Sequence, residues 1–121
     1  MNEEMFKQRT KNLALNVIKL IEQLPKNKTS DIIGRQLLRS ATSVGANYRA
    51  ACRGKSTADV IAKLAIVEEE ADETIYWMEL LTESGDILKQ QLQDLMKEAD
   101  EITAMTVASI KTLRNHNEKK F

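Results

Sequence analysis

The chain has 121 residues, which suits one domain with one hydrophobic core. Hydrophobic residues make up 42% and charged residues 30%, whereas one proline, four glycines and five aromatic residues argue against a β-sandwich or β-barrel. The net charge is zero but unevenly distributed, because residues 31–56 carry five basic and one acidic side chain while residues 57–84 carry one basic and eight acidic ones. Composition therefore predicts an all-α fold in one domain covering residues 1–121.

The N-terminal stretch lacks the basic, apolar and small-residue pattern of a signal peptide. No apolar run approaches the roughly 18 residues that a membrane-spanning helix needs. We therefore expect a cytoplasmic protein with no membrane partner. The single cysteine, Cys52, cannot form an intrachain disulfide and is expected to be a small core residue.

The first predicted helix covers residues 3–24, where apolar residues recur at spacings of three and four. Pro25 is expected to end it. The following polar connector is short, which favours antiparallel packing of the helices it joins. Ser30 or Thr29 is expected to cap the next helix by accepting a hydrogen bond from a free backbone N–H.

The second predicted helix covers residues 30–54 and has two opposite faces. With about 100° of rotation per residue, its apolar residues share one side and its arginines the other. No acidic residue lies within residues 32–56 to neutralise these arginines. The cationic face consists of Arg35, Arg39, Arg49 and Arg53, with Lys55 beyond the expected helix end.

The third predicted helix covers residues 57–83 and opens with a capping box at Ser56. Besides its core stripe it carries a second apolar strip, which meets either another helix of the bundle or another subunit. Glu70 and Glu73 border this strip and are either solvated or paired with an arginine of the second helix. The predicted oligomer interface consists of Ile66, Glu70, Glu73, Trp77 and Leu80.

The fourth predicted helix covers residues 87–115, with Leu88 opening its inner side. The only histidine, His116, does not form the Glu-x-x-His pair that a di-iron bundle needs, and no nucleophile has a positioned base. Glycine-rich phosphate-binding motifs are also absent. We therefore expect no metal, no cofactor and no enzymatic activity.

The stretch QLLRSATSVGANYRAACRGKS, followed by IAKLAIVEEEADETIYWMELL, resembles the bacterial four-helix-bundle family encoded in intervening sequences of 23S rRNA genes, sometimes called S23 ribosomal proteins. The resemblance implies an antiparallel, up-down-up-down four-helix bundle. The matching residues are Gln36, Leu37, Arg39, Ala41, Ser43, Val44, Asn47, Ser56, Lys63, Leu64, Glu70 and Leu80.

A related protein, the accessory protein of diversity-generating retroelements, forms a five-membered ring and binds nucleic acid and a reverse transcriptase. The resemblance thus implies a homopentamer and a nucleic-acid contact through the second-helix arginines, with a reverse transcriptase or another protein as a further partner. Two hypotheses follow for the cationic face. It binds RNA or DNA through its phosphates, or it pairs with the acidic third helix of a neighbouring subunit or protein partner.

Overall fold

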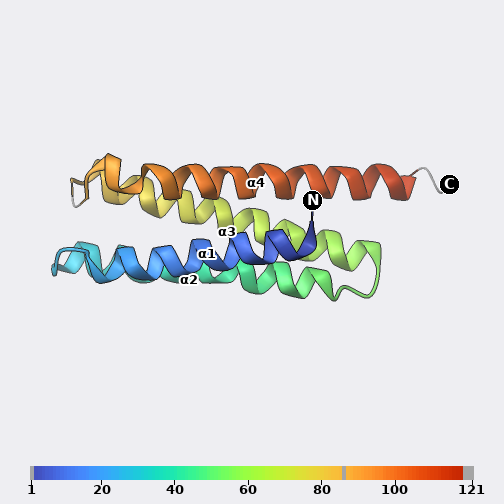
Figure 1. Ribbon diagram of the computed structural model, residues 1–121, viewed down its shortest axis with the longest axis horizontal. Helices are drawn as coiled ribbons and strands as arrows, with labels where there is room; N and C mark the ends of the chain where they lie inside the picture. Colours follow the sequence, from blue (N-terminus) through green and yellow to red (C-terminus); the bar gives the residue numbers. More distant parts are fainter. Residues whose placement is uncertain (1, 86, 119–121) are drawn as a thin grey trace.

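The computed structural model describes residues 2–85 and 87–118, with side chains up to His116. Its four helices are α1 (Glu3–Glu22), α2 (Lys28–Cys52), α3 (Thr57–Glu83) and α4 (Lys89–Glu118), and the described residues contain no strand. The helices lie side by side and alternate in direction along the long axis (Figure 1). The predicted all-α, antiparallel up-down-up-down bundle is therefore confirmed. None of the described helices combines the length and apolarity needed to cross a bilayer.

Side chains at the helix starts accept hydrogen bonds from otherwise free backbone N–H groups. The predicted cap of α3 is confirmed, because the Ser56 hydroxyl accepts from the N–H of Asp59 at 3.0 Å. The predicted cap of α2 was wrong. Asn27 caps this helix and accepts from the N–H of Ser30 at 2.8 Å, so that Thr29 and Ser30 lie inside the first turn. Asparagine is as good a cap as serine and stands earlier in the connector.

Two helices end slightly earlier than predicted. α1 ends at Glu22 because Leu24 precedes Pro25, whose ring disfavours helical backbone at the residue before it. α2 ends at Cys52, before the expected end at Gly54, and the next two N–H groups bond to carbonyl groups three residues back. This tighter bonding closes the last turn.

The start of α4 also differs from the prediction. The helix begins at Lys89, and Ile87 packs into the core ahead of it, with its N–H donating to the carbonyl oxygen of Leu81 at 3.3 Å. Leu88, which was predicted to face the core, is 67% exposed because it lies in the turn before the helix. At the other end, α4 continues to Glu118, beyond the predicted end at residue 115.

One cluster of buried hydrophobic side chains runs through all four helices. Within it, the rings of Phe6 and Tyr48 meet edge to face with centroids 4.5 Å apart. A polar pair lies in the same interior, where the hydroxyls of Thr74 and Ser40 are 3.0 Å apart across the α2–α3 interface. The largest fully buried hydrophobic side chains are Phe6, Leu13, Leu37, Met78, Leu81, Leu92 and Ile102.

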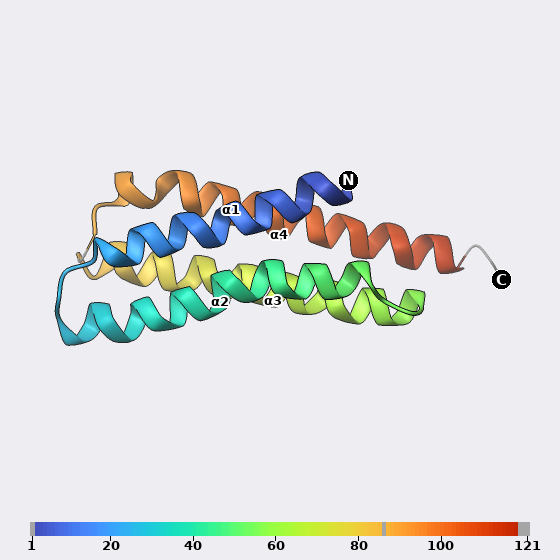
Figure 2. The ribbon, with the colours of Figure 1, turned by 60° about the horizontal axis from the view of Figure 1, so that its bottom comes forward.

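The helices do not pack equally against one another. α2 and α3 pack along most of their length, α4 packs on α3, and α1 packs on α2, whereas α1 and α4 touch only sparsely. Figures 1 and 2 show that α1 starts well short of the bundle end formed by the α2–α3 connection. An open groove of about 680 Å³ lies at this end between α2, α3 and α4, and it is also lined by Glu3 at the start of α1. Its lining includes Tyr48, Cys52, Val60, Leu64, Met105 and Leu113.

Candidate nucleic-acid interface

The predicted cationic face lies on the outward side of α2, and all of its members are solvent-exposed. Arg35 is 78% exposed at its side chain and pairs with Asp31 one turn earlier, at 3.1 Å between Nη2 and Oδ2. Asp31 lies one residue before the acid-free interval 32–56, so the sequence prediction did not include this partner. Lys55 lies beyond the end of α2, and its backbone N–H donates to Oδ2 of Asp59. The cationic face is thus exposed but partly neutralised at Arg35.

The other arginines of this face form no ion pair within the described part of the chain. Within the described part of the chain, Arg39, Arg49 and Arg53 have no carboxylate within 4 Å. Their guanidinium groups are therefore available to phosphate or carboxylate groups of another molecule, which they can contact through two parallel hydrogen bonds.

No acidic residue of α3 forms an ion pair with these arginines among the described residues. One carboxylate oxygen of Glu70, Oε2, is buried without a hydrogen-bond partner among the described residues. Burial raises the pKa of Glu70, the charge of Glu73 raises it further, and Arg39 acts in the opposite direction without forming an ion pair. Glu73 instead accepts a hydrogen bond from the indole Nε1 of Trp77 at 3.1 Å.

The residues predicted to form an oligomer interface all lie half-buried on α3. Trp77 packs against the core cluster, and its ring meets the 52%-exposed Tyr76 edge to face, with centroids 5.1 Å apart. Leu80 and Ile66 lie on the same side of the helix as Trp77, by the rotation of about 100° per residue. This side therefore presents aromatic and aliphatic area next to the buried oxygen of Glu70.

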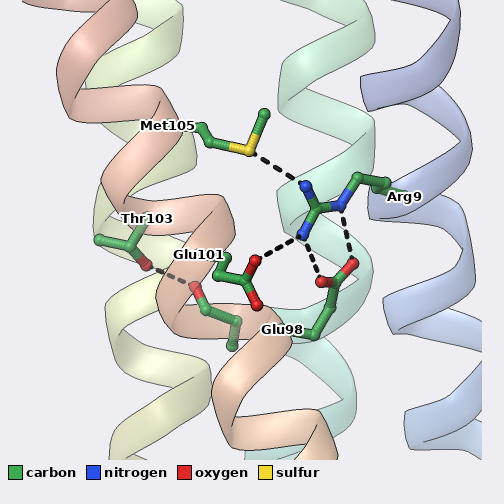
Figure 3. A network of polar contacts seen from close by, with 6 residues as sticks. Arg9, Glu98, Glu101, Thr103 and Met105 are labelled. Atoms are coloured by element: carbon green, nitrogen blue, oxygen red, sulfur yellow. Dashed lines mark hydrogen bonds and ion pairs between the residues drawn. The ribbon is translucent and has the colours of Figure 1, made fainter. Parts of the chain in front are cut away.

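The prediction missed a polar network that joins α1 to α4 (Figure 3). Arg9 donates through Nε to Oε2 of Glu98 at 3.0 Å, lies 3.7 Å from Glu101, and contacts the sulfur of Met105 through Nη1 at 3.2 Å. The hydrogen bond with Glu98 raises the pKa of Arg9. In the sequence, the only indication of this network was that Arg9 adjoins the buried Thr10 and so lies at the edge of the core stripe of α1.

A second missed feature extends the positive charge from α2 onto α1. A groove of about 460 Å³ lies between these helices, with Lys7 and Lys11 on the α1 side and Arg49 on the α2 side. The sequence pattern could place Arg49 on an outward face but could not show which helix lies next to it. The lysines of α1 were therefore absent from the predicted site.

The fold and these charges define a class: an antiparallel four-helix bundle with an exposed cationic face on one helix. The chain matches the model of the 23S rRNA-intervening sequence protein family over residues 3–108, and it belongs to this family. It is also similar to the crystal structure of a protein of unknown function from the S23 ribosomal protein family of Bacteroides thetaiotaomicron VPI-5482.

That similarity has a TM-score of 0.85 and 34% sequence identity, and it covers 92% of this chain and 99% of the other. No curated protein matches the chain significantly. The resemblance seen in the sequence is therefore confirmed at the level of the family and the fold.

Proposed function

We propose that this protein is a non-catalytic, homo-oligomeric helical bundle that binds RNA or another nucleic acid through the cationic face of α2. The observation that carries the proposal is the set of Arg39, Arg49 and Arg53, which are exposed and have no acidic partner among the described residues. Arginine pairs with phosphate through two hydrogen bonds, which favours it over lysine for backbone contacts. Arg35 and Lys55 extend the contact at either end of the face.

The assembly matters because each subunit offers only a few phosphate contacts. Several copies on one body convert weak single contacts into higher overall affinity. The resemblance to the accessory protein of diversity-generating retroelements favours five copies.

The test is a fluorescence-anisotropy titration with a structured RNA and with duplex DNA at two salt concentrations. Wild type is compared with Arg39→Ala/Arg49→Ala and with a matched control, Lys97→Ala/Lys111→Ala, which removes two exposed charges from α4. We expect the arginine variant to bind at least ~10-fold more weakly and to show a shallower salt dependence, since each lost phosphate contact reduces the slope by about one. Equal affinities for all three proteins would contradict the proposal.

A second candidate function is that of a protein-interaction scaffold, which is favoured by the buried oxygen of Glu70 that has no hydrogen-bond partner in the described part of the chain. An arginine of a neighbouring subunit could pair with this carboxylate while Ile66, Trp77 and Leu80 supply apolar contact area. In that case Arg39→Ala/Arg49→Ala changes the oligomer mass in light scattering, and wild type binds no nucleic acid. A wild-type monomer whose mass is unaffected by the substitutions would contradict the scaffold.

A further inference from the structure

The groove between α1 and α2 has cationic rims and a floor of small residues. Lys7 and Lys11 line it from α1, and Arg49 lines it from α2. Among its lining residues only Glu4 is acidic. The floor consists of short side chains that leave the groove open: Thr10, Ala14, Thr42, Gly45 and Ala46.

The two helices that form the groove approach closely at Gly45. A Cβ atom at this position would lie 3.2 Å from the Oγ1 atom of Thr10, which is closer than side chains usually come. The floor hydroxyls are already used, since Thr10 donates to the carbonyl oxygen of Lys7 at 3.1 Å and Thr42 to that of Leu38 at 2.8 Å. The rim cations are therefore the main hydrogen-bond donors available to a ligand.

The rim cations differ in how far they are neutralised. Lys7 has the carboxylates of Glu3 and Glu4 at 3.6 and 3.8 Å, whereas Lys11 and Arg49 have none within 4 Å in the described part of the chain. These two unpaired cations lie on opposite rims of the groove. Because Arg49 also belongs to the cationic face of α2, the groove joins that face to α1.

We propose that this groove holds a stretch of nucleic-acid backbone, with Lys11 and Arg49 contacting its phosphates from opposite rims. The inference rests on the proposed function and extends it, because it assigns Lys11 of α1 to the site. None of the residues that line the groove is aromatic or a large aliphatic residue, so it offers no large apolar contact to anchor a peptide side chain. A nucleic-acid backbone instead presents repeated phosphates, which the rim cations can contact.

Lys11→Gln tests this assignment in the full-length protein, with the α2 arginines intact. The matched control is Lys19→Gln, which removes the same charge from an exposed position of α1 outside the groove. We expect Lys11→Gln to weaken RNA binding by roughly 3- to 10-fold and to reduce the salt slope by about one, while Lys19→Gln stays near wild type. Circular dichroism melting curves check that both variants fold.

The possible outcomes separate the two proposals. If wild type binds, Arg39→Ala/Arg49→Ala weakens binding, and Lys11→Gln equals Lys19→Gln, the groove assignment alone fails. If wild type does not bind nucleic acid, the proposed function fails and the groove assignment with it. Polyglutamate serves as a competitor, and tighter binding of polyglutamate than of RNA with the same dependence on Lys11 would overturn the groove as a phosphate site.

Discussion

Arg9 holds Glu98 across the interface between α1 and α4, with Nε donating to Oε2 at 3.0 Å. The two residues are 89 positions apart in the chain, and both side chains are about three-quarters hidden from solvent, at 25% and 30% exposure. Because α1 and α4 touch only sparsely, this pair is one of few direct links between them among the described residues.

Separate and combined replacement by Arg9→Leu and Glu98→Gln should reveal a favourable coupling of about 1–2 kcal/mol in urea unfolding. The coupling should exceed that of an exposed pair because two hydrogen bonds of a partly buried guanidinium are lost. The exposed Arg35 and Asp31 pair is the control and should couple by less than about 0.5 kcal/mol. Additive effects of the Arg9 and Glu98 substitutions would contradict the prediction.

Gly54→Ala should destabilise the connection between α2 and α3. A Cβ atom at this position would lie 2.5 Å from Cγ2 of Val60 and 3.1 Å from the carbonyl oxygen of Ala51, so neighbouring atoms must move. Overpacking of this kind costs about 1–3 kcal/mol, which chemical denaturation measures. The cost should be smaller when the same change is made in a Val60→Ala background. An unchanged unfolding midpoint would show that the connector adapts freely.

Glu70→Gln should stabilise the isolated chain at pH 7 and lose this effect near pH 4. Burial raises the pKa of Glu70 above its unfolded value of about 4.3, so the folded protein binds this proton more tightly. The wild-type contribution to stability is therefore fully present below that unfolded value and is lost as pH rises through the folded pKa. Glu70→Gln cannot ionise at this position, so the variant does not lose this stability as the pH rises.

Thermal melts of wild type and Glu70→Gln across this pH range measure the effect, with the exposed Glu69→Gln as the control. A lower melting temperature for Glu70→Gln at pH 7, together with a smaller oligomer mass, would instead indicate that a neighbouring subunit pairs with the Glu70 carboxylate.

Cys52 should react slowly with Ellman's reagent at pH 8 in the native protein. Burial raises the pKa of its thiol, and the carboxylate of Glu3 raises it further through a hydrogen bond, so less of the reactive thiolate is present. Absorbance stopped-flow with and without urea measures the rate, and unfolding should accelerate the reaction. Native and unfolded rates that are equal would contradict the burial of this thiol.

The helices could be predicted from the sequence because their apolar residues repeat at helical spacing over long stretches. The ends of the helices were harder to predict. Ser30, Thr29 and Asn27 are all good caps within one polar connector, and the choice among them depends on where the chain turns. Ile87 is apolar in a helical pattern, yet it anchors the turn before α4 through its backbone bond to Leu81.

The candidate site was predicted only where a single helix determines it. The exposure of Arg39, Arg49 and Arg53 follows from their angular position on α2. The role of Lys11 and the pair of Arg9 with Glu98 depend on which helices are neighbours and on their relative register. Helical periodicity carries neither kind of information.

The unequal contacts between helices also determine how the bundle opens. α2 and α3 form the most extensive interface, whereas α1 is held mainly by α2 and only sparsely by α4. Local opening of α1 should therefore require less free energy than global unfolding, and its backbone amides should exchange with deuterium ahead of those in α2 and α3. A strand seated across α1 and α2 would slow this exchange by favouring the closed state, so that binding and the local stability of α1 become one linked equilibrium.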